Sequence, residues 1–419
     1  MRRVLLVFSI LLPLMLVGCV SMALPMVSSR GADVPAEPRL LAIPQGVETW
    51  EANRGALLEQ FQDAIYGAYP ADAETEVLER RLIDENAYDG RGIVEEYRLS
   101  MAGRETYLVT VRPRTHTGPL PIVVMQLFCG NRAAMGGRED ISPSMSGGGC
   151  DGDSWVSVPV RMVFGEHIME PPIPAILDRG YALAFTFAGD IVPDSREAAP
   201  AALADLVPDQ PSGAIIAWAW VYSRIIDVLE RDPAYDPQRM AVWGHSRNGK
   251  SALLAAAFDE RVDLVIAHQA GTGGTSLNRS PAGESIGQIT SSYPHWFSPA
   301  YSGFHGREAL LPVDQHQLIA LMAPRPLLIG GAWRDQWADP QGSFRAARSA
   351  NPVYALYGSD GLSQPDMASF DPEADIALFM RRGLHGVRQS DWANFLAFLD
   401  AHFQPGPNTG PNIGPNTGE

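Results

Sequence analysis

The chain has 419 residues, of which 46% are hydrophobic, and its formal net charge at pH 7 is −16. This length and composition allow one extended domain with a large buried core. The negative charge argues against a nucleic-acid-binding protein and against attachment to an anionic membrane surface. A polyanionic substrate would need a locally basic pocket.

Residues 1–19 have the features of an export signal. Arg2 and Arg3 precede an apolar run, Val4 to Val17, that is too short to span a bilayer comfortably. The run ends in Leu16-Val17-Gly18-Cys19, which resembles the lipobox of a bacterial lipoprotein. We therefore expect a lipoprotein-type signal peptide with lipidation at Cys19, and a location in the outer membrane or periplasm. Residues 20–44, rich in Pro and Ser, would form a flexible tether.

The type of signal peptide and the state of the two remaining cysteines each have an alternative interpretation. An ordinary secretory signal cleaved near Ala23 or Ser29 would also lead to export. The two remaining cysteines, Cys129 and Cys150, suggest a disulfide in an exported protein, and two separate thiols are the alternative.

Strand and helix patterns alternate between residues 45 and 404, the expected catalytic domain. Helices are expected from about residue 54 to 66, at 215–230, whose apolar residues nearly encircle it, and at 391–403. Strands are expected at 92–99, 105–112, 121–128, 181–187, 240–243, 264–267, 324–330 and 374–379. The first two of these strands alternate polar and apolar residues, which is typical of strands at the edge of a sheet. Residues 129–178 are irregular and suggest an insertion near the site. The repeat at 405–419 is expected to be a disordered tail.

The alternation implies a mostly parallel sheet with helices on both faces. Around residue 246 the sequence also has the features of a nucleophile elbow. An apolar strand is followed by Gly244-His245-Ser246-Arg247-Asn248-Gly249 and then by a helix of small residues. Such a turn exposes the Ser hydroxyl above the sheet, while helix N–H groups face a developing oxyanion. A Ser that caps the helix is the alternative. Together these features predict an α/β fold of the three-layer α/β-hydrolase type.

A base and an acid follow the elbow in the chain order of α/β-hydrolases. His385 lies after the last expected strand, between Gly383 and Gly386, and is the candidate base. Asp335 follows the preceding strand and is the candidate acid, which would hold the His tautomer. Asp339 is its competitor, although an Asp before Pro more often starts a turn.

Four further residues are candidates for substrate or oxyanion contacts. Arg247 would place a guanidinium beside the reacting carbonyl, or else form a salt bridge on the first helical turn. Lys250 opposes the helix dipole, which hints at a bound polar ligand or a solvated side chain. Trp296 and Trp337 could pack on a sugar ring or lie in the core.

Several motifs between about residues 121 and 403 resemble those of glucuronoyl esterases, the fifteenth carbohydrate-esterase family. The motifs are Gly-His-Ser-Arg-Asn-Gly-Lys at 244–250, Gly-Thr-Gly-Gly at 271–274, Gly-Glu at 283–284, Pro-His-Trp-Phe at 294–297, Asp-Gln-His at 314–316, Ala-Pro-Arg-Pro at 323–326, Trp-Ala-Asp-Pro at 337–340 and Gly-Leu-His-Gly at 383–386. The resemblance implies that Ser246 is the nucleophile, His385 the base and Arg247 part of the oxyanion site.

The same resemblance implies that Lys250, Glu284 and Trp337 contact the hydroxyls and ring of a uronic acid. It also marks a departure, because fungal members carry the catalytic Glu where this chain has Gln269. Some bacterial members take the acid from the next strand, which fits Asp335.

The sequence therefore predicts a serine esterase that hydrolyses 4-O-methyl-glucuronic acid esters, as in lignin–carbohydrate linkages of glucuronoxylan. A broader carboxylesterase, such as an acetyl-xylan esterase, and a catalytically dead carbohydrate-binding lipoprotein are the alternatives. No cofactor or metal is expected, because no His, Cys and Asp cluster has ligand spacing. We expect a monomer that binds glucuronoxylan or small uronate esters, meets the membrane only through its lipid anchor and binds no nucleic acid.

Overall fold

The computed structural model describes residues 46–147, 157–280 and 282–403. The signal peptide, Cys19, the tether, Cys150 and the C-terminal repeat lie outside these residues. The described strands are β1 (Thr75–Asn86), β2 (Gly92–Met101), β3 (Arg104–Pro113), β4 (Leu120–Gln126), β5 (Ala182–Thr186), β6 (Tyr235–His245), β7 (Leu264–His268), β8 (Leu327–Ala332) and β9 (Ile376–Arg381).

The described helices lie between and around these strands. The α-helices are α2 (Val47–Phe61), α3 (Ala87–Gly90), α4 (Asn131–Ala134), α5 (Ser157–Phe164), α6 (Ile173–Asp178), α7 (Ala199–Leu206), α8 (Ala214–Leu229), α9 (Arg247–Phe258), α10 (Ile286–Ser292), α11 (Pro299–Ser302), α12 (Gln315–Ala320), α13 (Pro340–Tyr354) and α14 (Gln389–Phe403). The π- and 3₁₀-helices are η1 (Gln62–Tyr66), η2 (Ala188–Asp190), η3 (Glu308–Leu310), η4 (Gln336–Ala338) and η5 (Ala355–Tyr357). None of the helices in the described ranges is long and apolar enough to cross a membrane.

The strands form one sheet in the order β1-β2-β3-β5-β4-β6-β7-β8-β9. The pairings from β5 through β4, β6, β7 and β8 to β9 are parallel, while β1, β2, β3 and β5 pair antiparallel. The carboxyl ends of the parallel strands therefore meet at one edge of the sheet, which is where ligands bind in open α/β sheets.

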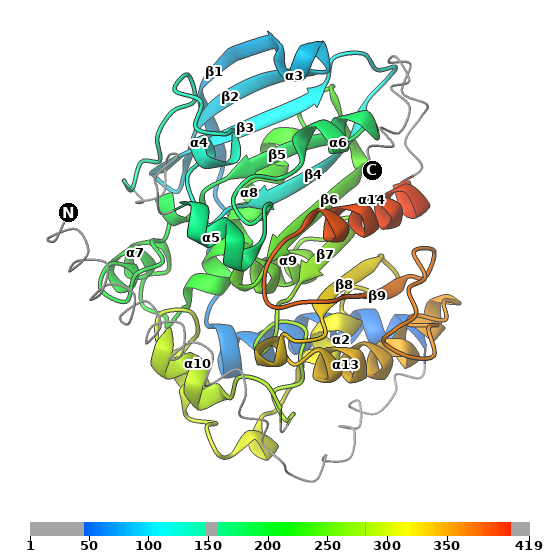
Figure 1. Ribbon diagram of the computed structural model, residues 1–419. Helices are drawn as coiled ribbons and strands as arrows, with labels where there is room; N and C mark the ends of the chain where they lie inside the picture. Colours follow the sequence, from blue (N-terminus) through cyan, green and yellow to red (C-terminus); the bar gives the residue numbers. More distant parts are fainter. Residues whose placement is uncertain (1–45, 148–156, 281, 404–419) are drawn as a thin grey trace, which may run out of the picture.

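Successive residues of one strand belong to different cores, which is the expected result of the two-residue period of a strand. Along β4, Ile122 and Val124 join a core that includes residues of α2, α8, α9 and α13. Val123 and Met125 join a second core with α6 and α14 on the opposite face. Figure 1 shows the sheet between these two helical layers. The predicted three-layer α/β-hydrolase fold is confirmed.

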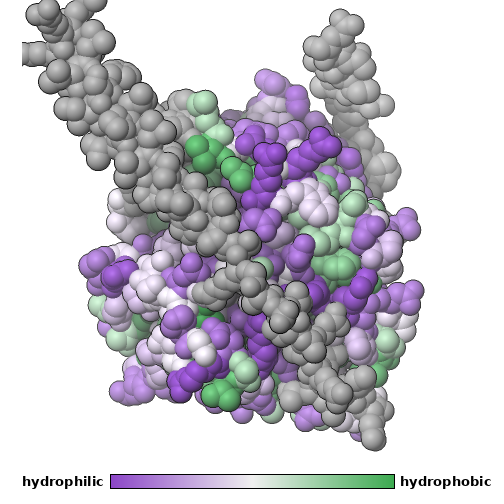
Figure 2. Space-filling model, turned by 60° about the horizontal axis from the view of Figure 1, so that its bottom comes forward, coloured by the Kyte–Doolittle hydropathy of each residue, from purple (hydrophilic) through white to green (hydrophobic). Residues whose placement is uncertain are grey.

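The longest fully buried helix in the described ranges is α8, in which every residue from Ala214 to Leu229 is buried. Burial of this helix was expected because its apolar residues nearly encircle it, and the structure confirms the expectation. The face of the molecule that comes forward in Figure 2 is mostly hydrophilic, with hydrophobic residues in small separate groups. This distribution agrees with apolar residues being used mainly in the two cores.

Three expectations from the sequence differ from the structure. The edge is formed by β1, so β2 and β3 are inner strands; β1 was missed because its charged sequence exposes most side chains. The first helix begins at Val47 rather than near Arg54 and continues into a π-helix to Tyr66. The region expected to be irregular contains α4, α5 and α6 in its described part.

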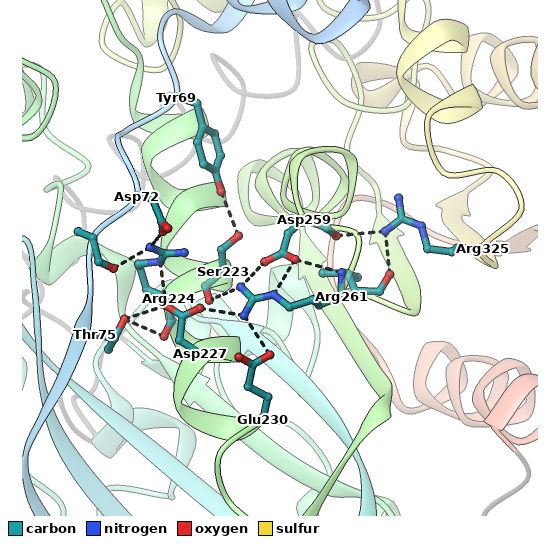
Figure 3. A network of polar contacts seen from close by, with 12 residues as sticks. Tyr69, Asp72, Thr75, Ser223, Arg224, Asp227, Glu230, Asp259, Arg261 and Arg325 are labelled. Carbon is teal, nitrogen blue, oxygen red and sulfur yellow. Dashed lines mark hydrogen bonds and ion pairs between the residues drawn. The ribbon is translucent and has the colours of Figure 1, made fainter. Parts of the chain in front are cut away.

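A polar network joins the far ends of α8 and α9, away from the elbow (Figure 3). Arg261 forms ion pairs with Asp227 (2.9 Å), Glu230 (3.0 Å) and Asp259 (2.8 Å). Arg325 donates to the carbonyl oxygens of Asp259, at 3.1 Å, and of two neighbouring residues. The network therefore fixes the end of the helix whose beginning forms the elbow.

We predict that Arg261→Met lowers the free energy of unfolding by about 1–3 kcal/mol, because it removes one of the partners of the largely buried Asp227 and Asp259 carboxylates. Urea unfolding followed by circular dichroism measures this, with the exposed Arg231→Met as control. Equal stability of both variants would show that the network contributes nothing.

Candidate active site

The elbow lies between β6 and α9 and has a strained backbone. Ser246 has φ 57° and ψ −123°, in a region that residues other than glycine rarely adopt. Its backbone N–H donates to the carbonyl of His268 on β7 (2.8 Å), which fixes the turn to the sheet. Its hydroxyl makes no capping hydrogen bond to α9, contrary to the capping alternative. The Ser246 side chain is thus left available at the carboxyl edge of the sheet.

Glycine is needed on both sides of the elbow because the strand and the helix approach closely. A Cβ on Gly244 would lie 1.9 Å from the carbonyl oxygen of Asn248. A Cβ on Gly249 would lie 3.0 Å from the carbonyl oxygens of Gly244 and His268. The Gly-x-Ser-x-x-Gly spacing therefore follows from the close packing of the strand against the helix.

The structure brings Asp335 and His385 together. His385 Nδ1 lies 2.8 Å from Asp335 Oδ2, and the Asp335 side chain is almost fully buried. The His385 ring is 4.6 Å from the ring of His245, the residue before Ser246. With Nδ1 engaged by the carboxylate, Nε2 is left to act on a hydroxyl proton.

Asp339, the competing acid, has a different role. It caps α13, with Oδ1 accepting from the backbone N–H of Gly342 (2.9 Å). Its Oδ2 accepts from the hydroxyl of Ser276, also at 2.9 Å. Both oxygens are engaged in fixing local structure, and the hydrogen bond to His385 belongs to Asp335.

Arg247 is held by a residue that the sequence analysis missed. Its Nη1 lies 2.9 Å from Oδ2 of Asp194, and its guanidinium lies over the ring of Phe128, 4.6 Å from the centroid. The other Asp194 oxygen accepts from His295 Nε2 (2.8 Å) and Trp296 Nε1 (2.7 Å). Burial would raise the pKa of Asp194, but these hydrogen bonds and the Arg247 charge lower it overall. The one sequence feature that could have identified Asp194 as a candidate site residue is its position soon after a buried strand.

The Lys250 side chain is not solvated. Backbone carbonyl oxygens, rather than a ligand, offset its unfavourable position at the start of the helix. Lys250 is buried, and its Nζ donates to the carbonyl oxygens of Ala270 (2.5 Å) and Thr272 (2.6 Å). Burial lowers the pKa of its ammonium, while the charges of Glu284 and Asp335 oppose that shift.

Glu284 is also buried, and its Oε1 has no hydrogen-bond partner. Burial raises the pKa of its carboxyl, while the Lys250 charge and a hydrogen bond from the Trp337 side chain lower it. An ammonium and a carboxylate oxygen with unused capacity can bind hydroxyl groups.

The two candidate tryptophans differ in exposure. Trp337 is half-buried, and its carbonyl accepts from the backbone N–H of Glu284 (3.0 Å). Trp296 is only 6% exposed, and its ring stacks on that of Tyr293 with centroids 3.8 Å apart. Tyr293, 37% exposed, therefore presents the more open aromatic surface of the pair.

Two other predictions concern cysteines and metals. Cys129 is disulfide-bonded, whereas Cys150, the partner that the sequence suggested, lies outside the described residues. Within those residues, no group of three His, Cys, Asp or Glu side chains could hold a metal ion.

Two buried histidines lie directly behind the elbow. His245 Nδ1 is 3.2 Å from His268 Nδ1, so one of these nitrogens carries the shared proton. Burial lowers the pKa of both rings well below the ordinary value. The charges of Arg381 and His385 act in the same direction on both rings. Both histidines therefore remain neutral beside His385.

Comparisons with known proteins agree with this geometry. A family model described as "Glucuronyl esterase, fungi" matches residues 187–358. A carbohydrate esterase from an unknown prokaryotic organism is 31% identical over 381 residues, covering 85% of this chain and 86% of the relative. A 4-O-methyl-glucuronoyl methylesterase from Wolfiporia cocos is 36% identical over 159 residues, covering 36% of this chain and 39% of that enzyme.

Solved structures extend the similarity to nearly the whole fold. A promiscuous CE15 esterase from a marine bacterial metagenome has a TM-score of 0.76 and 29% identity, covering 88% of this chain and 98% of that one. A glucuronoyl esterase from Solibacter usitatus has a TM-score of 0.73 and 27% identity, covering 88% of this chain and 99% of that one.

We predict that His245 and His268 each lower the stability of the fold as the pH drops below about 6.5, the ordinary histidine pKa. The unfolded chain then binds protons that folded His245 and His268 exclude, which costs about 1.4 kcal/mol per pH unit for each residue. Denaturant unfolding between pH 7 and pH 5 measures the slope. Glu284, Asp263 and Asp391, whose pKa values burial raises to about 7, 6 and 6, act in the opposite direction. The test is therefore the difference between wild type and His268→Gln, in which the loss of stability per pH unit should be smaller by about one histidine's share. An unchanged slope would contradict the neutral, buried state of His268.

Proposed function

The chain belongs to the glucuronoyl esterase family, the fifteenth carbohydrate-esterase family (CE15), and it is a carboxylic ester hydrolase that acts on glucuronic acid esters. On this premise we propose that its substrates are esters of 4-O-methyl-glucuronic acid, such as those joining glucuronoxylan to lignin alcohols, and that Ser246 is the nucleophile. The observation that carries the assignment of the residues is the His385–Asp335 hydrogen bond beside the elbow.

The proposed reaction proceeds in two steps. His385 Nε2 takes the proton of the Ser246 hydroxyl as its oxygen attacks the uronate carbonyl, and Asp335 stabilises the imidazolium. The ester C–O bond then breaks, and the leaving alcohol takes the proton from His385. Water, deprotonated by the same His385, then attacks the acyl-enzyme. The bond to the Ser246 oxygen breaks, His385 returns the proton to that oxygen, and the uronate is released. Arg247 and backbone N–H groups at the start of α9 stabilise the oxyanion in both steps.

The substrate sugar is proposed to lie near Lys250, Glu284 and Trp337. Lys250 and Glu284 would hydrogen-bond the ring hydroxyls, and Trp337 would contact the ring. Trp296 is less suited to direct contact, because Tyr293 covers its ring and its N–H is given to Asp194. Trp296 would then contribute to substrate binding indirectly, by holding Tyr293 through ring stacking or Arg247 through Asp194.

Export and membrane attachment belong to the same proposal. We propose that residues 1–19 direct export, that Cys19 is lipidated, and that residues 20–44 tether the catalytic domain to its lipid anchor, in the outer membrane or periplasm. The charge of −16 agrees with attachment through a lipid rather than through a basic surface.

A broader carboxylesterase is the second candidate, because the solved relative with 29% identity is described as promiscuous. The two differ in whether the sugar contacts are needed for turnover. A catalytically dead binding protein is less consistent with the His385–Asp335 geometry, since Gln269 is not the partner of His385.

We predict that the protein cleaves benzyl glucuronate more efficiently than p-nitrophenyl acetate. Ser246→Ala and Asp335→Asn should each lower kcat on the glucuronate by roughly 10⁴-fold or more. Asp339→Asn, the matched control, should keep most of the activity because that residue caps α13 and accepts from Ser276, and does not bond His385. Preference for the acetate would favour the broader esterase. Full activity of Asp335→Asn would refute the proposed acid.

We also predict that Glu284→Gln lowers kcat/KM for benzyl glucuronate by about 10- to 100-fold, the cost of losing a charged hydrogen bond to a substrate hydroxyl. Activity on p-nitrophenyl acetate should stay within about threefold, because the acetate lacks those hydroxyls. The exposed Glu260→Gln serves as control. Equal losses on both substrates would mean that Glu284 supports the site rather than the sugar.

A further inference from the structure

The loop that carries His385 is enclosed by two buried polar side chains, Arg381 and Gln269. Arg381 ends β9, and its Nε donates to Asp391 on α14 at 2.9 Å. Its Nη2 donates to the carbonyl oxygens of Leu384 (2.8 Å) and Gly386 (2.6 Å), the residues on either side of His385. One guanidinium thus holds both flanks of the loop, and its charge is offset by a buried carboxylate.

Gln269 holds the same two residues from the other side. It follows β7 and is 4% exposed. Its Oε1 accepts from the backbone N–H of Gly386 (2.8 Å), and its Nε2 lies 3.4 Å from the carbonyl oxygen of Leu384. Its own backbone N–H donates to the carbonyl of Gly330 on β8 (2.8 Å), so the amide has a rigid base.

A third contact ties the loop to α5. The backbone N–H of Val387 donates to the carbonyl of Phe164, at the end of α5, at 2.7 Å. A Cβ on Gly386 would lie 2.1 Å from that same carbonyl oxygen, so the backbone can come this close only at a glycine. The backbone around His385 is therefore held by three separate elements, the end of β9, the residue after β7 and the end of α5.

The chemistry of residue 269 explains why an amide suits this place. The loop presents one N–H and one carbonyl oxygen to it, and a neutral amide can accept from the first and donate to the second. An ionised carboxylate could accept but not donate, and it would face the Leu384 carbonyl unfavourably. Since Asp335, which follows the neighbouring strand β8, already engages Nδ1 of His385, a second carboxylate is not needed.

We propose that Gln269 and Arg381 are positioning residues that fix the backbone on both sides of His385, so that its ring can be aligned with Asp335 and the elbow. This inference rests on the proposed Ser246–His385–Asp335 arrangement. Gln269 acts through the loop and touches neither the substrate nor the reacting atoms. A displacement of about 1 Å at a reacting group can cost 10²-fold in rate, so loss of this support should lower kcat far more than it changes KM.

The test compares Gln269→Leu and Gln269→Glu with a matched control, Gln364→Leu. Gln364 is equally buried, and its side chain bonds the backbone of Leu378 and of a surface loop, away from the site. We expect both changes at 269 to lower kcat by about 10- to 100-fold with KM within about threefold. Gln364→Leu should lower the melting temperature without this loss of kcat. Unchanged kcat in Gln269→Leu would overturn the proposal.

A double variant separates positioning from acid catalysis. Gln269→Glu in the Asp335→Asn background should be no more active than Asp335→Asn alone, because the side chain at 269 faces the loop backbone and not Nδ1 of His385. Recovery of about tenfold or more would overturn the proposal and identify position 269 as an acid site. If Gln269→Leu fails to fold, the two Gln269→Glu variants still decide the question.

A second readout keeps this proposal distinct from the proposed substrate. The rate at which a p-nitrophenyl alkylphosphonate modifies Ser246 depends on His385 but needs no uronate. We expect Gln269→Leu to slow this modification by about the same factor as kcat. If wild type reacts with the phosphonate but hydrolyses no glucuronate ester, the proposed substrate fails and the positioning role can still be measured. Equal phosphonate rates in wild type and Gln269→Leu would overturn the positioning role itself.

Discussion

The arrangement of the site depends on one hydrogen bond, between Nδ1 of His385 and Oδ2 of Asp335. The two residues follow β8 and β9, which are neighbours in the sheet, so the acid and the base start from adjacent strand ends. The serine follows β6, on the other side of β7. The base must therefore extend across two strands toward the elbow, and its loop needs support along the way. Arg381, Gln269 and the carbonyl of Phe164 provide that support.

The elbow is constrained in a comparable way at both ends of α9. At the start of the helix, Ser246 is strained, and Arg247 is tied to Asp194, which also binds His295 and Trp296. At the far end, Arg261 links α9 to the last turns of α8 through three carboxylates. A helix fixed at both ends can hold a strained turn, because the cost of the strain is spread over many contacts.

Much of this arrangement could be predicted from the sequence, because it follows from chain order and local spacing. Parallel strands place His385 and Asp335 at the same sheet edge as Ser246, and glycines mark the close approach of β6 and α9. Asp194 could not be found this way, since its partners are brought to it only by folding. The contacts of Lys250 with two carbonyl oxygens and of Gln269 with the His385 loop also form only on folding, so the sequence could not reveal them. The strand β1 was missed because its charged side chains obscure the alternation of an edge strand.

The most direct test of the account is a proton NMR spectrum of the downfield imidazole region. We expect a His385 Nδ1–H resonance in wild type and in Asp339→Asn, and its loss in both Asp335→Asn and His385→Gln. A resonance that disappears in His385→Gln but persists in Asp335→Asn would show that another group holds His385. That result would contradict the arrangement on which the proposed esterase mechanism depends.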